Sequence, residues 1–128
     1  MNNSYQKIKQ KLTAAKRLLL LTHLDPDGDA IGSAIAFAEI ARSINPKIKI
    51  KTVVKHVSKI SIKYFVDKYG FVDCHDFDGG NYDLAAALDT STVSRLSLDI
   101  PVDINIDHHH DNQRYAGLNV VDGGAASV

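Results

Sequence analysis

Short apolar runs alternate with amphipathic segments along this chain. Continuous apolar runs such as residues 84–88 are typical of strands buried on both faces. Strict alternation after Pro46 instead predicts a strand with one solvated face, near the edge of a sheet. We therefore expect strands at residues 18–21, 47–54, 71–77, 84–88, 102–106 and 118–121.

Helical spacing of apolar positions separates most of these strands. We expect helices at residues 3–16, 29–43, 58–68 and 90–98, the last of them short. In the third helix the inward positions would be Ile62, Phe65, Val66 and Tyr69. Strands that alternate with helices predict an α/β fold with a mainly parallel sheet flanked by helices.

Composition is that of an ordinary globular domain, with 45% hydrophobic and 23% charged residues in 128. No secretory leader precedes the first helix, and no apolar run approaches the roughly 20 residues that a membrane span needs. The single cysteine, Cys74, excludes an internal disulfide and is typical of a reducing compartment. We therefore expect a cytoplasmic protein with no membrane partner.

The net charge of zero conceals an asymmetry between the two halves. Residues 1–68 hold 13 Lys and Arg against 5 Asp and Glu, whereas residues 69–128 hold 2 against 10. One interpretation is that the halves pack together and cancel. The other is that the lysines attract a polyanionic substrate while the aspartates hold cations.

Metal-ligand residues follow three of the predicted strands. The first run leads into His23, Asp27 and Asp29, the run at 84–88 ends at Asp89, and the run at 102–106 precedes Asp107-His108-His109. Parallel sheets bind ligands beyond the carboxyl ends of their strands, so these side chains should converge. Carboxylate and imidazole without thiolate suit manganese, magnesium or iron better than structural zinc.

The spacing predicts a dinuclear site. Asp27 and Asp29 should point to opposite sides of a tight loop, and Asp89 could bridge two ions. Two ions roughly 3.5–4 Å apart can activate a water and neutralise a phosphate's developing charge. Taken singly, Asp29 or Asp89 could equally be a helix cap.

Side chains alternate along a strand, so only one of two adjacent residues faces a given point. We therefore expect His108 on a metal, His109 on the substrate phosphate or leaving group, and Asp107 fixing an imidazole tautomer. Arg95 is either a phosphate contact or an ordinary surface arginine.

Three ordered motifs resemble those of the DHH phosphoesterase superfamily. They are His23-Leu-Asp-Pro-Asp-Gly-Asp-Ala-Ile-Gly-Ser33, Leu88-Asp-Thr90 and Ile106-Asp-His-His-His-Asp-Asn112. The resemblance implies a two-manganese phosphoesterase, with magnesium or another divalent ion as a substitute. It implies that His23, Asp27 and Asp89 hold one ion, and that Asp29, Asp89 and His108 hold the other. It also places His109 at the phosphate, and we expect Ser33 on the substrate side.

Residues 28–33 are similar to the nanoRNase branch, which groups oligoribonucleases with phosphoadenosine-phosphate phosphatases. The function expected is therefore manganese-dependent hydrolysis of short oligonucleotides or nucleotide bisphosphates. Alternatives are a cyclic-dinucleotide phosphodiesterase or a pyrophosphatase of the same superfamily, or a non-catalytic nucleotide-binding module.

The family carries a fourth motif with a further Asp and a second, substrate-binding domain, and neither fits in 128 residues. Asp122 lies too close to the third motif to replace that Asp, and residues 123–128 resemble a loop entering a helix. We therefore expect residues 1–128 to be an incomplete DHH domain, with weak metal binding and little turnover alone. Exposed apolar surface would favour a homodimer or other self-association.

Overall fold

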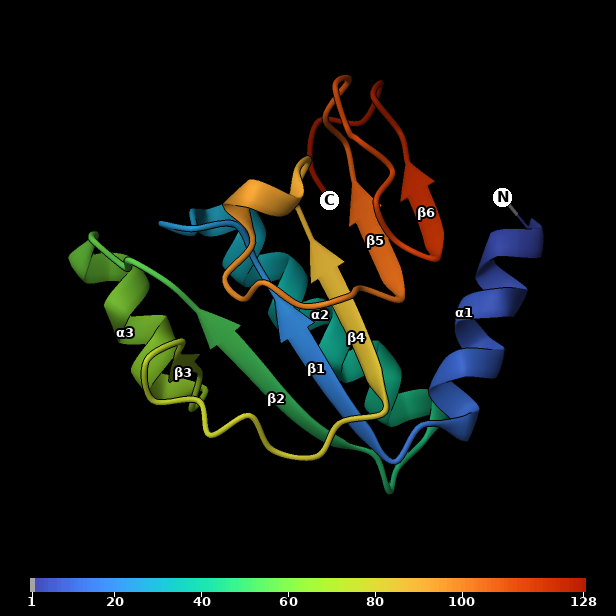
Figure 1. Ribbon diagram of the computed structural model, residues 1–128, viewed down its shortest axis with the longest axis horizontal. Coiled ribbons are helices and arrows are strands. Elements are labelled where there is room, and N and C mark those ends of the chain that lie inside the picture. The colour runs from blue at the N-terminus through green and yellow to red at the C-terminus, as the bar shows by residue number, and fades with distance from the viewer. Residues whose placement is uncertain (1) are drawn as a thin grey trace.

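One parallel sheet organises the computed structural model, which describes residues 2–128 (Figure 1). The sheet order is β3-β2-β1-β4-β5-β6, and every neighbouring pair is parallel. The chain therefore winds outward from the centre twice, and the direction reverses between β1 and β4. The strands are β1 (Arg17–Leu21), β2 (Lys49–Val54), β3 (Val72–Asp73), β4 (Leu84–Leu88), β5 (Ile104–Asp107) and β6 (Leu118–Val121).

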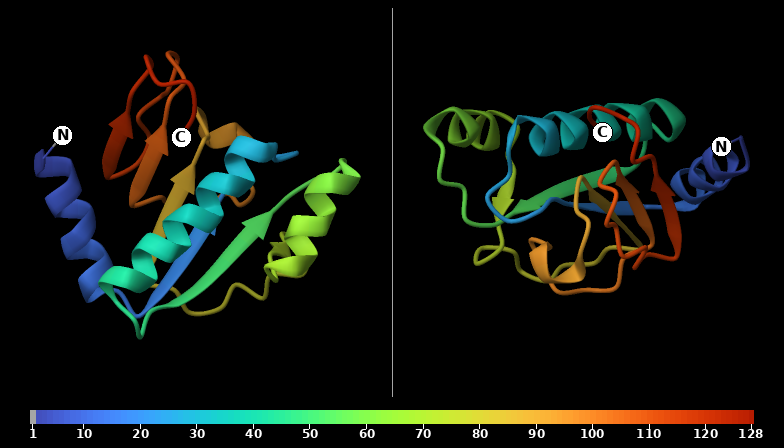
Figure 2. Two further views of the ribbon diagram at one scale, coloured as in Figure 1. Left: turned by 180° about the vertical axis from the view of Figure 1, so that it is seen from behind. Right: turned by 90° about the horizontal axis from the view of Figure 1, so that it is seen from above.

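Helices α2 (Gly28–Ile44) and α3 (Ile60–Lys68) cover one face of the sheet, α1 (Asn2–Ala14) stands at its side near β6, and loops cover the other face (Figure 2). The loops include the short 3₁₀ helix η1 (Val93–Arg95). Within residues 2–128, no helix combines the length and the apolar composition needed to cross a membrane. The predicted α/β fold with a mainly parallel sheet is confirmed, and the sheet is entirely parallel.

The core lies on both faces of the central strands. Leu18 and Leu20 pack toward α2, while Leu19 and Leu21 face the loops of the opposite side. Strand β4 is buried along its whole length, as the continuous apolar run predicted. The central strands are therefore rigidly held, and their carboxyl ends are fixed relative to one another.

The third helix is shorter than predicted, and of the four positions predicted to face inward only Ile62 and Val66 pack on the core. Ile62 is buried against Ile31 and Val54, but Phe65 and Tyr69 are 39% and 47% exposed. Those two rings stack on each other outside the core, with centroids 6.5 Å apart. The prediction that both point inward was wrong because α3 lies at the sheet edge and has little core to fill.

Two predicted elements are mostly loop. Residues 90–98 contain only the three-residue η1, because the segment pairs in extended form with the chain after β1: Leu24 donates to the Arg95 carbonyl at 2.7 Å, and Ser97 to that of Thr22 at 2.9 Å. In residues 71–77 only Val72 and Asp73 pair with β2, because the Asp73 carboxylate then accepts the amide of His75 in a turn.

Candidate metal centre

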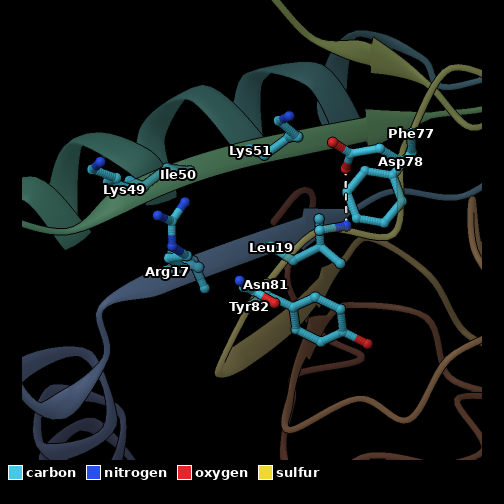
Figure 3. Close-up of a pocket in the computed structure, with 11 residues that line it drawn as sticks. Arg17, Leu19, Lys49, Ile50, Lys51, Phe77, Asp78, Asn81 and Tyr82 are labelled. Carbon is cyan, nitrogen blue, oxygen red and sulfur yellow. Dashed lines mark hydrogen bonds between the residues drawn. The ribbon is translucent and has the colours of Figure 1, made fainter.

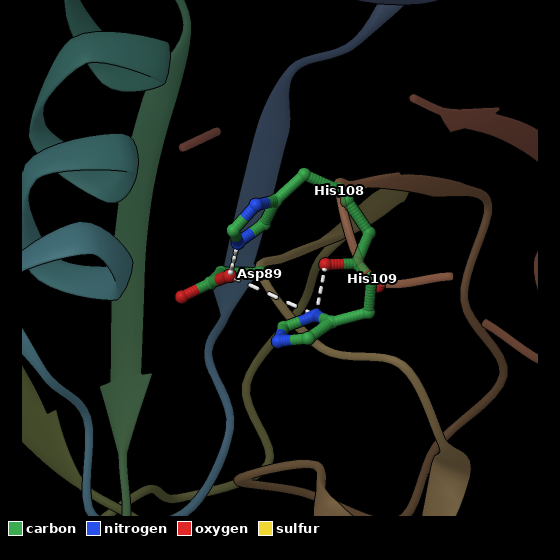
Figure 4. Close-up of side chains that lie close together, drawn as sticks. Asp89, His108 and His109 are labelled. Atoms are coloured by element: carbon green, nitrogen blue, oxygen red, sulfur yellow. Dashed lines mark hydrogen bonds and ion pairs between the residues drawn. The ribbon is translucent and has the colours of Figure 1, made fainter. Parts of the chain in front are cut away.

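The carboxyl ends of β1, β4 and β5 meet beside the start of α2, at the point where the sheet order reverses. This arrangement brings together all five residues predicted as metal ligands: His23, Asp27, Asp29, Asp89 and His108. Figure 4 shows Asp89 between the strand ends, facing the imidazoles of His108 and His109.

Asp89 is the central residue of the site and is 2% exposed. Its Oδ1 lies 3.1 Å from Nε2 of His108, and its Oδ2 lies 3.5 Å from Nε2 of His23. The backbone at Asp89 has a φ of 57°, in the left-handed region, while its amide still donates to the carbonyl of Ile106 at 2.9 Å. The turn after β4 therefore directs one carboxylate oxygen toward each of two imidazoles.

His23 presents its Nε2 to two carboxylates. Its Nδ1 lies 2.8 Å from the backbone oxygen of Leu24, so Nδ1–H donates there and Nε2 faces Asp89 and the Oδ1 of Asp27 at 3.6 Å. The hydrogen bond to Asp89 raises the pKa of His23 and outweighs the opposing effect of burial. A metal bound at Nε2 would therefore compete with the proton that these carboxylates favour on the imidazole.

Asp27 both faces the site and caps α2. Its Oδ1 accepts the amide of Ala30 at 2.9 Å, which makes it the N-cap. Burial acts to raise the pKa of Asp27, but the Ala30 amide and the neighbouring His23 lower it overall. The carboxylate is thus held in its charged form at the positive end of the helix.

His108 repeats the arrangement of His23 on the other side of Asp89. Its Nδ1 donates to the carbonyl of Ala125 at 3.1 Å, and its Nε2 also lies 3.2 Å from the Oδ2 of Asp29. The hydrogen bond to Ala125 is the main reason that the pKa of His108 is raised. Asp29 in turn accepts the hydroxyl of Ser33 at 3.3 Å and the backbone amide of Val128 at 3.1 Å.

His109 points to a different partner from His108. Its Nδ1 lies 2.6 Å from the Oδ1 of Asp107, whose side chain is fully buried, and 3.9 Å from the Oδ1 of Asp89. The His109 side chain is 43% exposed. Asp107 therefore fixes the tautomer in which Nδ1 of His109 carries a proton, and Nε2 remains available at the surface.

A buried polar network behind the site was not predicted. Asn112 donates to the Oδ2 of Asp107 at 2.7 Å and to the Oδ1 of Asn105 at 2.8 Å. Asn105 donates to the carbonyl of Ala87, and the carbonyl of Thr90 accepts the Tyr115 hydroxyl at 2.9 Å. Burial raises the pKa of Tyr115, which keeps that hydroxyl a donor. Only the polar Asn105 inside an apolar strand could have signalled this network in the sequence.

Four other charged residues or hydroxyls lie around the site rather than in it. Ser33 contacts Asp29, whereas Arg95 is exposed on η1 and no hydrogen bond or ion pair of its side chain is found among residues 2–128. Asp25 turns away and accepts the hydroxyl of Ser58 at 2.7 Å. His110 is exposed and lies beside Gly123.

The donor set fits two divalent cations. Ligand atoms about 2.0–2.2 Å from one ion lie about 3 Å apart, and the nearest carboxylate and imidazole atoms here are separated by 3.1–3.6 Å. Both His23 and His108 use Nδ1–H on a backbone carbonyl, which leaves Nε2 as the ligand atom. No Lys or Arg among residues 2–128 forms an ion pair with these carboxylates. Cations would therefore relieve the repulsion among them.

Comparisons with known proteins agree with this fold. Residues 17–127 match the N-terminal domain of the DHH family. A crystal structure of an exopolyphosphatase-related protein from Bacteroides fragilis superposes with a TM-score of 0.85 over 99% of this chain and 41% of that chain, at 18% identity. At that identity the likeness concerns the fold.

Curated relatives are longer than this chain. A probable bifunctional oligoribonuclease and PAP phosphatase NrnA from Streptococcus mutans is 28% identical over 98% of this chain and 40% of its own length. The Bacillus subtilis protein named bifunctional oligoribonuclease and PAP phosphatase NrnA is 31% identical over 87% of this chain and 35% of its own length. An uncharacterised protein from Methanocaldococcus jannaschii is 32% identical over 87% of this chain, which covers 24% of that protein. This chain therefore spans about a quarter to two fifths of these relatives, and over residues 17–127 it belongs to the DHH family as an N-terminal domain.

Proposed function

We propose that this chain forms the metal-binding part of a manganese-dependent phosphoesterase that hydrolyses short oligonucleotides or nucleotide bisphosphates. The observation that carries the proposal is Asp89, whose two oxygens face His23 on one side and His108 on the other. The names of the NrnA relatives favour this substrate class over others.

Each side chain has a place in the proposed centre. His23 and Asp27 would hold one ion, Asp29 and His108 the other, and Asp89 would contact both. When bound, the two ions would supply Lewis-acid activation of a water and of the phosphate ester. Carboxylates and imidazoles without thiolate suit manganese, magnesium or iron better than structural zinc, so we propose manganese, with magnesium or another divalent ion as a substitute.

His109 would contact the phosphate and hand a proton to the leaving oxygen. Its Nδ1 is bound to Asp107, so the exposed Nε2 is the atom available to the substrate. Asp107 would stabilise the protonated imidazole, as a buried carboxylate beside histidine does in other hydrolases. Ser33 would orient Asp29 by donating its hydroxyl to that carboxylate. Arg95 would contact a phosphate of the substrate.

The test is hydrolysis by the full-length protein with manganese. Asp89→Ala should lower turnover of a dinucleotide and of 3′-phosphoadenosine 5′-phosphate by at least about a hundredfold, as expected when a metal ligand is lost. Parental turnover in this variant would contradict the proposal. Rates on pyrophosphate and on a cyclic dinucleotide, measured beside these two substrates, identify the substrate class. A highest rate on pyrophosphate would favour a pyrophosphatase, and a highest rate on the cyclic dinucleotide would favour a cyclic-dinucleotide phosphodiesterase.

Metal binding has its own matched pair of variants. His108→Gln should remove most of the manganese-dependent rise in melting temperature, because a ligand that binds only the folded state stabilises it. His110→Gln, two residues away and exposed, should retain that rise. An equal response from both variants would show that His108 is not a ligand. Nucleotide binding that needs neither manganese nor Asp89 would favour a non-catalytic module.

A further inference from the structure

A second pocket lies on the loop-covered face of the sheet, on the amino-terminal half of β1 and β2. Its volume is about 300 Å³, within the range of small-ligand sites. The metal centre lies beyond the opposite, carboxyl ends of the strands. This pocket is therefore separate from the proposed phosphoesterase site, and a ligand bound in it would not depend on the proposed function.

Three cationic side chains gather at this pocket. Arg17 and Lys49 are paired in register on neighbouring strands, and Lys51 pairs with Leu19 one step further on. The three cationic side chains therefore share a face, and all are exposed. Like charges directly opposite each other destabilise a sheet, so this arrangement has an electrostatic cost in the absence of an anion.

No carboxylate among residues 2–128 forms an ion pair with these cations. Among residues 2–128 the one Lys or Arg side chain with an ion-pair partner is Arg42, which pairs with Glu39 on α2. Asp78 lines the same pocket, but its Oδ1 accepts the amide of Gly80 at 2.9 Å within its own loop. The charge of the pocket is therefore positive overall.

Apolar and aromatic groups make up the other end of the pocket. Figure 3 shows the rings of Phe77 and Tyr82 on either side of Leu19, with Arg17 and Lys49 lying together at the opposite end. Tyr82 is 37% exposed, so its ring has a face open to a ligand. A flat ring could stack there while a phosphate reaches the cations.

We propose that this pocket binds a nucleoside monophosphate. The phosphate lies against Arg17, Lys49 and Lys51, and the base lies between Phe77 and Tyr82 at the other end of the pocket. The carboxylate of Asp78 and the amide of Asn81, at the same rim, offer an acceptor and a donor to the edge of the base. The chemistry selects an anion with an aromatic body over inorganic phosphate or a neutral nucleoside.

The test is a titration of the ¹⁵N-labelled protein with adenosine 5′-monophosphate, in EDTA so that no metal contributes. Amide resonances of Leu19, Ile50 and Tyr82 should shift, with a dissociation constant of about 1 mM or tighter. Adenosine and inorganic phosphate should each bind at least about tenfold more weakly, since each lacks one half of the contacts. Equal affinity for phosphate alone would overturn the aromatic part of the proposal.

Paired variants test the residues. Lys49→Ala/Lys51→Ala should weaken binding at least about tenfold, through loss of two charge-assisted contacts. Lys47→Ala/Lys63→Ala removes the same charge from exposed lysines outside the pocket and should leave the affinity unchanged. Tyr82→Leu should weaken binding of the nucleotide but not of phosphate. Equal affinity in the two double variants would overturn the proposal.

The metal centre provides the last control. Asp89→Ala should retain the affinity for the nucleotide in EDTA, whatever it does to hydrolysis. Shifts confined to residues 23–29 and 107–109 would show that the nucleotide binds at the metal centre and that this pocket is not a site. Failure of the proposed phosphoesterase activity would leave these measurements unaffected.

Discussion

At the scale of single residues, the site depends on which imidazole nitrogen is occupied. His23 and His108 each use Nδ1 on a backbone carbonyl, whereas His109 uses Nδ1 on the carboxylate of Asp107. The same side chain therefore serves as a candidate metal ligand twice and as a candidate proton donor once. The partner of Nδ1, a backbone carbonyl or the Asp107 carboxylate, distinguishes these roles.

Asn112 is expected to act as a positioning residue through Asp107. Asn112→Ala removes the donor to a buried carboxylate oxygen, so we expect the free energy of unfolding to fall by about 1–3 kcal/mol. Turnover by the full-length protein should fall about 10–100-fold, as is typical when a residue that hydrogen-bonds to an active-site side chain is lost. Gln113→Ala, at the exposed neighbouring position, should change neither urea unfolding nor turnover measurably. Parental turnover in Asn112→Ala would contradict this role.

The candidate ligands could be predicted because they follow strands that the sequence marks clearly. The apolar segments before His23, Asp89 and His108 are typical of buried strands, and parallel strands place their ends together. The network of Asn105, Asn112 and Thr90 could not be predicted in the same way. Its members are linked by hydrogen bonds that depend on the conformations of two loops. The periodicity of apolar residues in the sequence does not predict those conformations.

At the scale of elements, α2 connects the fold to the site through its N-cap residue, Asp27. Asp27→Ala should lower the free energy of unfolding by about 0.5–2 kcal/mol, because the Ala30 amide loses its cap. Asp27→Asn keeps a good N-cap and should retain most of that stability, while removing a charged metal ligand. Chemical unfolding in EDTA compares the two variants. A similar loss in both would mean that the charge, and not the cap, stabilises α2.

A carboxylate binds the backbone amides at the start of β1. The carboxylate of Asp83 accepts the amides of Lys16 and Arg17 at 3.0 and 2.9 Å, and these bonds lower its pKa from the ordinary 3.8. Because the pKa of Asp83 is lower in the folded state than its ordinary 3.8, the ionised carboxylate stabilises the fold above pH 3.8. This stabilisation is lost as the pH falls through the pKa of the folded state. Asp83→Asn should therefore be less stable than the parent at pH 7, and the gap should close below pH 3.8.

Urea unfolding at neutral and acid pH measures this gap. Asp99→Asn is the control, since its exposed carboxylate accepts no hydrogen bond within residues 2–128. A constant difference between Asp83→Asn and the parent across the pH range would show that the carboxylate does not titrate differently on folding.

Most elements could be predicted, and the failures share one cause. Strands β1 and β4 could be predicted because their apolar runs are buried almost throughout, and helix α2 because it buries one face at helical spacing. Residues 90–98 have helical spacing, yet they pair with the chain after β1 and stay extended. Phe65 and Tyr69 follow the helical pattern inward, but the edge of the sheet offers them no core. Tertiary contacts overrode local preference in both places.

At the scale of the whole molecule, charge is divided between the two ends of the sheet strands. Aspartates crowd the carboxyl ends at Asp27, Asp29 and Asp89, while Arg17, Lys49 and Lys51 occupy the amino-terminal half. The opposite charges of the two halves of the chain therefore lie at separate places and do not simply cancel. The negative potential at the carboxyl ends favours cations, and the positive potential at the amino-terminal half favours anions.

An apolar groove beside α2 is expected to promote self-association. It has a volume of about 610 Å³ and includes Phe37, Leu88 and Ile106, with Ile40 49% exposed at its rim. Ile40→Lys should shift the protein toward monomer in analytical ultracentrifugation, because it places a charge in the contact. Ile60→Lys, on α3 and outside the groove, should not. A parent that is monomeric at high concentration would refute the expectation.

The backbone at Asp89 narrows what chemistry this position can host. A left-handed φ of 57° is accessible to glycine, asparagine and aspartate at low cost. Glycine brings no donor atom, and asparagine brings one oxygen without charge. Aspartate therefore combines low cost in the turn with a charged carboxylate of two oxygens, whereas an engineered glutamate would add about 1–2 kcal/mol of main-chain strain.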